Sequence, residues 1–382
     1  MRILLITSSD IRERSGGGFA NRAFYDSLTM HFHNSIDVIQ YIAEDCKDDE
    51  INIVSLPFAT KFTKIKTVLR GRIHRLYNWL LAYLDERKNK YQVCVINSGL
   101  YGDIVPEIKK RGIRVVTVHH NFEAIFQLEN RRPTTLWGLT SWFVRRNERR
   151  AYQLSDLNIF LSAYDRDMMR THYGTTDSQN DVVVGVYETQ EQSKTIPKEV
   201  TVQTPSIDVA ISGCLNHLQT ELGIKDFVAH YDVLFKKMMP SSQLVISGKD
   251  PGKFIKEFAK SEAVVLRPNP NNMDEALKDC SIYLCPVNVG SGVKFRILDG
   301  LRLGMPILTH AVSARGYEMF ADKLWFQSYH DEASFEKGLR AILAYIEKHE
   351  DFRSEIIHEY QSAFSFETGD KRFVEAISRL IV

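Results

Sequence analysis

Short apolar runs alternate along this chain with longer stretches in which apolar residues recur at every third or fourth position. The apolar runs cover residues 3–7, 36–42, 51–54, 93–96, 115–118, 157–161 and 182–184 in the first half, and residues 208–212, 243–247, 263–266, 282–285, 307–309 and 324–326 in the second. A continuous apolar strand is buried on both faces, whereas the helical spacing marks only one buried face. The alternation therefore predicts parallel β-sheets that are covered by helices on both sides.

The pattern stops once, in the polar stretch 188–206, and then starts again. We interpret this stretch as a linker between a first domain, residues 1–187, and a second domain, residues 207–365. The tail has a helical pattern from Phe335 onward, and we expect its last part, residues 366–382, to be a helix that returns to the first domain. Two doubly wound, Rossmann-like α/β domains would then face a central cleft at the carboxyl ends of their strands.

Composition narrows the class of protein. Of the 382 residues, 44% are hydrophobic and 25% are charged, which is typical of a globular chain, and the net charge of +1 provides no overall field for nucleic acid. No apolar run approaches the roughly 18 residues that span a bilayer, and the first residues predict a buried strand rather than a signal peptide. The five cysteines are scattered and form no CxxC pair. We therefore expect a cytoplasmic protein with reduced thiols and no nucleic-acid partner.

Three consecutive glycines, Gly16, Gly17 and Gly18, follow the first predicted strand and open a helix. Because glycine has no Cβ, the N–H groups of such a loop can approach an anion next to the positive end of the helix. The sequence matches neither GxGxxG nor a P-loop, and a flexible loop explains the glycines equally well.

A second candidate for anion binding is the segment 290–306 (GSGVKFRILDGLRLGMP), which lies between two predicted strands. Its glycines expose N–H groups at an expected helix start, and Arg296 and Asp299, three residues apart, share one face of that helix. Such a face offers a cation for a diphosphate and a carboxylate for a ribose diol, and Gly304 predicts the end of the helix. The alternative is an ordinary amphipathic helix with a surface ion pair.

Two adjacent histidines, His119 and His120, end a predicted buried strand. Because strands of a doubly wound sheet open onto the cleft at their carboxyl ends, His120 is a candidate active-site residue. His119 would point to the opposite face if the strand continues through it. The alternative is a buried histidine with a structural hydrogen bond.

The chain has one DxD sequence, Asp165-Arg166-Asp167, which begins three residues after Ser162. We interpret Ser162 as the N-cap of a helix with an acidic first turn. A divalent metal site is the less favoured alternative, and no metal cofactor is expected.

Residues 61–84 combine charge and aromatic character. Six lysines and arginines lie between Lys61 and Arg75 without an acidic residue, and a run of leucines, tyrosines and a tryptophan follows. A basic helix with an aromatic face suits an anionic membrane surface, here the inner face of the cell membrane. The alternative is an amphipathic helix that packs on the sheet with solvated cations.

The segment 290–299 resembles the GxG-(I/V)-x-x-K-x-L-E-A donor motif of family 4 and related retaining glycosyltransferases of the GT-B fold. Three weaker matches accompany it. Residues 118–123 (VHHNFE) are similar to the HN-x-E segment of the first domain, residues 148–162 to an ERxAxxxAD-hydrophobic-hydrophobic-S pattern, and residues 211–215 to the strand and glycine that open the second domain. The resemblance extends over most of the chain, and the donor segment is its most specific part.

The resemblance implies that a nucleotide-diphosphate sugar binds to the second domain and a glycan or lipid-linked acceptor to the first. Arg296 occupies the position of a phosphate-binding lysine and Asp299 that of a ribose-binding glutamate, and His120 is implied to lie near the transferred sugar. These three are the implied catalytic residues, supported by Asn121 and Glu123. The implied donor-binding residues are Gly16, Gly17, Gly18, Gly213, Lys249, Gly290, Ser291, Gly292, Val293 and Lys294.

Three departures from the family pattern affect the site. Asp299 is one methylene shorter than glutamate, so its helix must lie closer to the ribose. The upstream glutamate of the E-x7-E pattern falls on Ser291, which has no carboxylate. The loop that opens the second domain lacks an arginine found in many relatives, and Lys225, Lys249 and Lys294 are the candidates to replace it.

Together these features predict a retaining, metal-independent glycosyltransferase of bacterial surface polysaccharide or glycoconjugate synthesis, bound peripherally to the membrane. Two alternatives are left open. One is a nucleotide-sugar epimerase or hydrolase on the same fold, and the other is a catalytically inert GT-B subunit that supports a partner transferase.

Overall fold

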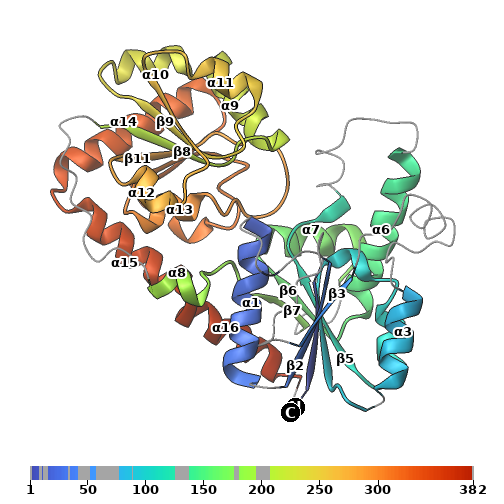
Figure 1. The fold of residues 1–382 in the computed structure, drawn as a ribbon. Helices are drawn as coiled ribbons and strands as arrows, with labels where there is room; N and C mark the ends of the chain where they lie inside the picture. Colours follow the sequence, from blue (N-terminus) through green and yellow to red (C-terminus); the bar gives the residue numbers. More distant parts are fainter. Residues whose placement is uncertain are drawn as a thin grey trace. The chain divides into compact units, whose positions relative to one another are not determined.

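The computed structural model describes residues 2–7, 11, 16–32, 35–41, 52–56, 77–87, 89–124, 137–175, 180–194 and 207–380 (Figure 1). The chain divides into two compact units. The first unit comprises Met1–Glu191 and Phe366–Val382, and the second comprises Gln192–Ser365. Each unit contains one sheet in which all strand pairs are parallel. The prediction of two Rossmann-like α/β domains is confirmed.

The sheet of the first unit has seven strands among the described residues, in the order β3-β2-β1-β4-β5-β6-β7. The strands are β1 (Ile3–Thr7), β2 (Ile36–Tyr41), β3 (Asn52–Leu56), β4 (Val93–Asn97), β5 (Arg114–His119), β6 (Leu157–Phe160) and β7 (Asp181–Val183). An order that runs outward on both sides of β1 is the doubly wound arrangement. Every residue of β1 and of β4 is buried, as their continuous apolar sequences predict.

Helices of the first unit come from both ends of the chain. They are α1 (Gly16–Phe32), α3 (Tyr77–Glu86), η1 (Gly99–Tyr101), α4 (Val105–Lys109), α6 (Trp137–Leu154), α7 (Ala163–Tyr173) and α16 (Phe366–Ser378). Helix α16, red in Figure 1, lies beside α1, which is blue. The rings of Phe24 and Phe373 are 4.7 Å apart between centroids, and Nε2 of His31 lies 2.7 Å from a carboxylate oxygen of Asp370. The last helix is therefore part of the first unit.

The sheet of the second unit has the strand order β10-β9-β8-β11-β12-β13. Its strands are β8 (Val209–Cys214), β9 (Leu244–Lys249), β10 (Val264–Pro268), β11 (Ile282–Cys285), β12 (Ile307–His310) and β13 (Phe326–Tyr329). The prediction of a strand at residues 324–326 is wrong by two to three positions. Leu324 is 61% exposed and precedes the strand, whereas Phe326 and Tyr329 are buried. The prediction rested on hydrophobicity alone and therefore included Leu324 in the strand, although this side chain is exposed.

The helices of the second unit are α9 (Leu218–His230), α10 (Asp232–Met238), α11 (Lys253–Phe258), α12 (Met273–Leu277), α13 (Ile297–Arg302), η3 (Glu318–Phe320), α14 (Glu332–Lys348) and α15 (Phe352–Phe364). Gly304 follows the end of α13, and its N–H group donates to Leu301 O at 3.0 Å. The N–H group of the next residue, Met305, donates to Gly300 O at 2.9 Å. These bonds confirm the predicted helix end.

The polar stretch 188–206 differs in part from the linker that its sequence predicts. It contains a short helix, α8 (Gln190–Lys194), and the N–H group of Gln190 donates to Oδ2 of Asp26 in α1 at 3.1 Å. Glu188 is buried. The stretch therefore begins as a folded segment of the first unit, because a carboxylate far away in the sequence accepts its backbone hydrogen bond. Residues 195–206 lie outside the described residues.

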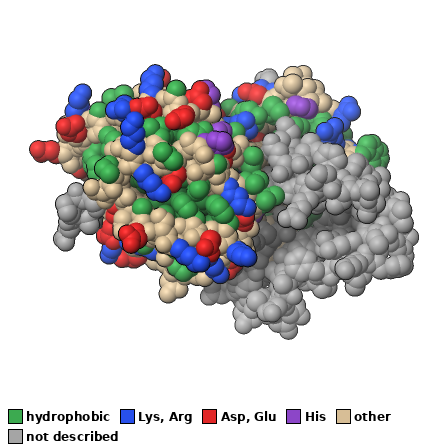
Figure 2. Space-filling model, turned by 90° about the horizontal axis from the view of Figure 1, so that it is seen from above, with side chains coloured by type: hydrophobic (Ala, Val, Ile, Leu, Met, Phe, Trp, Pro, Cys, Tyr) green, Lys and Arg blue, Asp and Glu red, His purple; other side chains and the backbone are tan. Residues whose placement is uncertain are grey.

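Charged side chains of both signs are intermixed on the face drawn in Figure 2. Helices of the second unit carry pairs of opposite charge one turn apart, such as Lys225 with Glu221, Lys236 with Asp232, and Lys278 with Glu275. Pairs of this kind are typical of solvated helix faces. On this face the described residues show no large area of a single charge.

Candidate functional site

The side chains of Arg296 and Asp299 meet at the carboxyl end of β8. Oγ of Ser212 donates to Oδ2 of Asp299 at 2.5 Å. Nη1 of Arg296 donates to Ser212 O at 3.3 Å, and Nη2 donates to Oγ1 of Thr220 at 2.9 Å. Arg296 is the residue before α13 and Asp299 lies in its first turn, so both reach the same strand end. Their spacing in the sequence predicted that they share one face of the helix. The structure shows that both contact Ser212 in β8.

The guanidinium of Arg296 lies directly against Gly213. A Cβ atom at position 213 would be 2.8 Å from Cζ of Arg296, which is too close for any real contact. The φ angle of Gly213 is +132°, in a region that other residues rarely adopt. Glycine is therefore required here for two reasons, the backbone conformation and the close approach of a cation.

The carboxyl group of Asp299 is perturbed by its surroundings. Burial raises the pKa of Asp299 to about 6, and Asp274 raises it too, while the hydrogen bond from Ser212 and the charge of Arg296 oppose this shift. Ser212 is itself held by the hydroxyl of Tyr283 at 2.7 Å. Asp299 is therefore ionised at neutral pH, and it gains a proton at mildly acidic pH more readily than an exposed aspartate.

Residues Gly290, Ser291, Gly292, Val293 and Lys294 form the loop between β11 and α13. Lys294 is buried, and its Nζ atom donates to Ser291 O at 2.9 Å and to Gly292 O at 3.4 Å. The ammonium group thus stabilises the loop from within. The expectation that the glycines stand at the helix start is wrong, because α13 begins only at Ile297. The side chain of Val293 packs against Gly316.

The N-terminal end of α9 faces this glycine loop. A Cβ atom on Gly290 would lie 2.0 Å from Nε2 of Gln219. In the part of the chain that the structure describes, this Nε2 atom is buried and has no hydrogen-bond partner. His217 is the N-cap of α9, and burial together with the charges of Arg296 and Lys294 lowers its pKa. Several hydrogen-bond donors therefore gather where α9 begins.

The other candidate cations lie at different places. Lys225 pairs with Glu221 on the surface of α9, with Nζ 2.5 Å from Oε1. Lys249 ends β9 and is exposed, and its carbonyl oxygen accepts a hydrogen bond from Leu215 N at 2.8 Å. Arg296 is thus the cation that contacts both β8 and α9.

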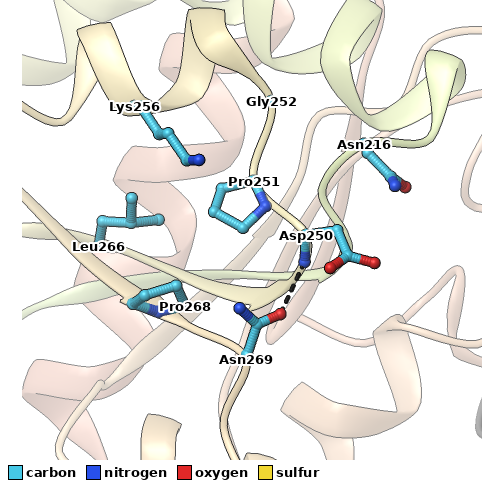
Figure 3. Close-up of a pocket in the computed structure, with 8 residues that line it drawn as sticks. All are labelled: Asn216, Asp250, Pro251, Gly252, Lys256, Leu266, Pro268 and Asn269. Carbon is cyan, nitrogen blue, oxygen red and sulfur yellow. Dashed lines mark hydrogen bonds between the residues drawn. The ribbon is translucent and has the colours of Figure 1, made fainter.

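A cavity of about 490 Å³ opens at the carboxyl ends of β9 and β10, next to the loop that follows β8 (Figure 3). It is lined by Asn216, Asp250, Pro251, Gly252, Lys256, Leu266, Pro268 and Asn269. Asp250 and Asn269 have φ angles of 52° and 50°, and Oδ1 of Asn269 accepts from Asp250 N at 2.8 Å. The volume is in the range of small-molecule sites, and the lining combines apolar surfaces with two side-chain amides, the carboxylate of Asp250 and the ammonium group of Lys256.

In the first unit, the two histidines at the end of β5 have different partners. Nε2 of His120 lies 2.6 Å from Oδ1 of Asn97 in β4, and His120 is partly exposed. His119 is buried, stacks on Phe160 with ring centroids 5.0 Å apart, and bonds to Asn158. Burial lowers the pKa of both imidazoles to about 4. Both rings are therefore neutral at physiological pH.

The backbone after His120 is held by two buried carboxylates. Oδ1 of Asp165 accepts from Phe122 N at 3.2 Å, and Glu148 accepts from Glu123 N at 2.5 Å and from Ala124 N at 3.1 Å. Burial and the nearby charge of Glu123 raise the pKa of Glu148 to about 8. The supporting candidates interact with each other, since Nδ2 of Asn121 lies 3.4 Å from Oε1 of Glu123.

The structure modifies the expectation for the three N-terminal glycines. Gly16, Gly17 and Gly18 are the first turn of α1 and do not form a loop before it. The N–H groups of a first helical turn have no acceptor inside the helix, and Gly18 in this turn is buried. Ser162 is the N-cap of α7, and its Oγ accepts from Asp165 N at 3.0 Å, which confirms the capping interpretation.

The segment 61–84 lies only partly within the described residues. Its basic part falls outside them, and helix α3 begins at Tyr77. Leu80, Tyr83 and Leu84 are buried in the core of the first unit. The expectation that this apolar face is available to a membrane is therefore wrong for these three side chains, because they pack inside the unit. In the described ranges no helix is long and apolar enough to cross a membrane.

Comparison with known proteins decides the fold. No protein-family model and no curated protein sequence match the chain. Solved structures match over nearly its whole length. HepE of Anabaena, crystallised with UDP and glucose, gives a TM-score of 0.65 at 11% identity, with 99% of each chain covered. The lipopolysaccharide outer core galactosyltransferase WaaB gives 0.67 at 11% identity, with 99% of each chain covered. The chain has the GT-B fold.

A third structure agrees. WaaG, a glycosyltransferase involved in lipopolysaccharide biosynthesis, matches with a TM-score of 0.65 at 13% identity, covering 97% of this chain and 98% of its own. Within the GT-B fold of this chain, both candidate clusters lie where strands end, one in each unit. The fold thus determines where the strand ends lie, and the side chains of the two clusters determine what each strand end can bind.

Sequence reasoning missed the partners of the predicted residues. Ser212, Thr220 and Asn97 hold Arg296 or His120. Ser212 lies in the segment 211–215 that resembles the family, but the resemblance assigned it no role, and Thr220 and Asn97 belong to no motif. The one available signal was a polar residue at the end of an otherwise apolar strand, as in Ser212 and Asn97. The cavity residues had no comparable signal.

Proposed function

We propose that this protein transfers a sugar from a nucleotide-diphosphate sugar to a glycan or lipid-linked acceptor. The observation that supports the proposal most is the meeting of Arg296 and Asp299 at the end of β8, beside a cavity with the volume of a small-molecule site. HepE, which has the same fold, has been crystallised with UDP-glucose, and WaaB is a galactosyltransferase.

In this proposal the donor lies along the carboxyl edge of the second sheet. The diphosphate contacts Arg296, the first turn of α9 and the glycine loop, where Gln219 contributes its unpartnered Nε2 atom. The ribose hydroxyls donate to Asp299. The base enters the cavity, where Pro251 and Leu266 offer apolar surface and the amide side chains offer hydrogen bonds.

The proposed chemistry follows from the charge that develops during transfer. When the bond between the anomeric carbon and the diphosphate oxygen breaks, the electron pair stays on the diphosphate. The acceptor hydroxyl oxygen bonds to the anomeric carbon, and its proton passes to the departing diphosphate. A fixed donor aimed at this charge contributes about 3–4 kcal/mol when water is excluded. Arg296 is fixed by Ser212 and Thr220, so it needs little rearrangement. Lys294 adds positive potential from behind the loop. These cations stabilise the leaving group in a transfer that we propose is metal-independent.

We propose that the first unit binds the acceptor. His120 would contact the transferred sugar, and the first turn of α1 would contribute N–H donors. We propose retention of the anomeric configuration because of the resemblance of segment 290–299 to retaining enzymes. A lipid-linked acceptor at the inner face of the membrane, in surface polysaccharide or glycoconjugate synthesis, is proposed from the basic residues 61–75.

A transfer assay tests this function. The protein is incubated with UDP-, GDP- or ADP-sugars, with and without glycan and lipid-linked acceptors, and the release of nucleoside diphosphate is measured. We expect release that depends on the acceptor and is lost in Arg296→Ala. The matched control is Arg340→Ala, which removes an exposed arginine paired with Glu336 on α14.

The other outcomes of this assay contradict the proposal in distinct ways. Release of nucleoside diphosphate without an acceptor would identify a hydrolase. Conversion of the donor sugar without release would identify an epimerase. A protein that binds no nucleoside diphosphate and releases none would be an inert GT-B subunit.

A further inference from the structure

Four polar side chains form a continuous chain of hydrogen bonds in the first unit. Nε2 of His120 lies 2.6 Å from Oδ1 of Asn97. Nδ2 of Asn97 donates to Oδ1 of Asn21, and Nδ2 of Asn21 donates to Oγ1 of Thr7 at 3.1 Å. Thr7, Asn21 and Asn97 are 0%, 3% and 1% exposed. An interior polar network therefore ends at the partly exposed ring of His120.

The positions of these residues explain why they meet. Thr7 is the last residue of β1, Asn97 is the last residue of β4, and His120 directly follows β5. These three strands are neighbours in the sheet, so their carboxyl ends lie side by side. Asn21 reaches the same edge from the N-terminal part of α1.

The order of donors and acceptors determines the state of the imidazole. Oδ1 of Asn97 has no hydrogen to donate, so Nε2 of His120 must carry one. The amides of Asn97 and Asn21 both donate away from the histidine, and each is oriented by the next residue of the chain. Among the described residues none forms a hydrogen bond with Nδ1 of His120, which is left as an acceptor.

We infer that Asn97, oriented by Asn21 and Thr7, is a positioning residue that holds the hydrogen of the neutral His120 ring on Nε2, so that Nδ1 accepts a hydrogen bond from a substrate hydroxyl. This inference rests on the proposed function, since the hydroxyl belongs to the transferred sugar or to the acceptor. A protonated imidazole carries a hydrogen on both nitrogens and could only donate. The network thus fixes the Nε2–H tautomer, and in the neutral ring Nδ1 can then accept a hydrogen bond from a hydroxyl group.

The charges around His120 agree with this assignment. Burial lowers the pKa of His120 to about 4, and repulsion from the neighbouring His119 when that ring is protonated lowers it too. On the α1 side the ring faces Phe24 edge-on, with ring centroids 6.4 Å apart, and on the β4 side it faces Asn97. Among the described residues no carboxylate contributes to the pKa of His120.

The choice of an amide at position 97 is informative. A carboxylate in the same place would favour the protonated ring and would make His120 an acid. Because Asp165 and Glu148 fix the backbone just after His120, a substitution of Asn97 should change the state of the ring more than the path of the chain. Asn97→Asp is therefore the variant that reverses the proposed effect.

Nitrogen-15 NMR of histidine-labelled protein reads the ring directly and needs no substrate. His120 is assigned by the signal that disappears in His120→Gln. In the wild type we expect the hydrogen on Nε2 and a neutral ring throughout pH 5.5–8. Asn97→Asp should bring the pKa of His120 into that range, whereas Asn78→Asp, which adds the same charge on an exposed face of α3, should not.

The inference is overturned if wild-type His120 carries its hydrogen on Nδ1, or if it titrates near the ordinary histidine pKa of about 6.5. The wild-type spectrum decides this even if Asn97→Asp fails to fold. In the transfer assay, Asn97→Asp should lower kcat by about tenfold with little change in the donor KM, and the loss should lessen at high pH.

Failure of the proposed function is distinguishable from failure of this inference. If no sugar is transferred but the spectrum shows the neutral Nε2–H ring, the network holds His120 as inferred and the transferase proposal is wrong. If transfer occurs and the ring is protonated near neutral pH, the transferase proposal stands and the positioning role of Asn97 is wrong.

Discussion

The two units are built on the same plan, but the side chains at their strand ends differ in charge. In the first unit, the end of the sheet holds His120 in a network of neutral amide and hydroxyl groups. In the second unit, the same edge holds a guanidinium, Arg296, and a carboxylate, Asp299, with the ammonium group of Lys294 inside the adjoining loop.

In the proposed glycosyl transfer, this difference would separate two tasks. Negative charge develops on the departing diphosphate, so fixed cations are useful where the donor binds. A sugar hydroxyl is neutral, and a neutral acceptor recognises it without the cost of burying an unpaired charge. Each of the two parallel sheets has one edge formed by the carboxyl ends of its strands. In the proposed transfer, the side chains at each edge determine whether that edge binds the diphosphate or a sugar hydroxyl.

The largest expected effect is the loss of the second unit's cation. Arg296→Ala should lower turnover by about 100-fold or more, because a fixed donor to the departing diphosphate is removed. The measurement is kcat with a nucleotide sugar at saturating acceptor. Wild-type turnover in Arg296→Ala would show that the charged cluster is not the donor site, and Arg340→Ala should behave as the wild type.

Displacing the same cation without removing it should have a smaller effect. In Gly213→Ala the new methyl group would lie 2.8 Å from Cζ of Arg296, so the guanidinium must move. We expect turnover to fall by about tenfold or more, in addition to backbone strain of about 1–3 kcal/mol. The control is Gly112→Ala, because Gly112 also has a positive φ angle, 73°, but has open space around it. If both variants lose stability equally and keep full activity, the close approach of Arg296 has no function.

Asp299→Ala should mainly raise the donor KM, by about tenfold, because the ribose hydroxyls lose their acceptor. Since the pKa of Asp299 is raised to about 6, the wild-type donor KM should also rise as the pH falls through 6. Asp299→Asn should abolish this pH dependence. A donor KM that is independent of pH in the wild type would contradict the assignment.

The raised pKa of Asp299 should also make the free energy of unfolding depend on pH. Because the folded pKa lies above the unfolded value of 3.8, ionisation of Asp299 opposes folding, and its cost appears as the pH rises from about 4 to 6. The wild type should therefore lose stability relative to Asp299→Asn over this range, by up to about 3 kcal/mol at 1.4 kcal/mol per pKa unit. Chemical denaturation of both proteins at pH 4 and pH 7 measures this difference.

The smallest expected effect concerns His217. Arg296 and Lys294 contribute to the lowering of its pKa, and a bound diphosphate would offset both charges. Nucleoside diphosphate binding should then take up a fraction of a proton and weaken as the pH rises, with an effect of about two- to fivefold. Calorimetry in buffers with different ionisation enthalpies counts the protons. Equal proton uptake in His217→Gln would assign it to another group.

Much of the fold could be predicted because the information is local. The runs 3–7 and 282–285 match β1 and β11 at both ends, since a strand buried on both faces must be apolar throughout. That Arg296 and Asp299 reach the same strand end followed from helical spacing. Errors arose where burial depends on distant contacts, as for Leu324 and for the inward face of α3.

The supporting residues could not be predicted, because their partners are far away in the sequence. Ser212 and Arg296 are 84 positions apart, and Asn97 and Asn21 are 76 positions apart. The sequence around a single serine or asparagine at a strand end does not indicate which distant residue it will hydrogen-bond. Such residues come together only when the helices pack on the sheet, because Arg296 precedes α13 and Asn21 lies in α1.

The most direct test of the charged cluster compares the affinities of UDP and uridine, with GDP and ADP and their nucleosides as the other bases, by titration calorimetry. We predict that the wild type and Arg340→Ala bind the nucleoside diphosphate at least about tenfold more tightly than the nucleoside, since a charge-assisted contact contributes about 1.5–3 kcal/mol. Arg296→Ala should bind both equally weakly. An undiminished preference for the diphosphate in Arg296→Ala would contradict the account.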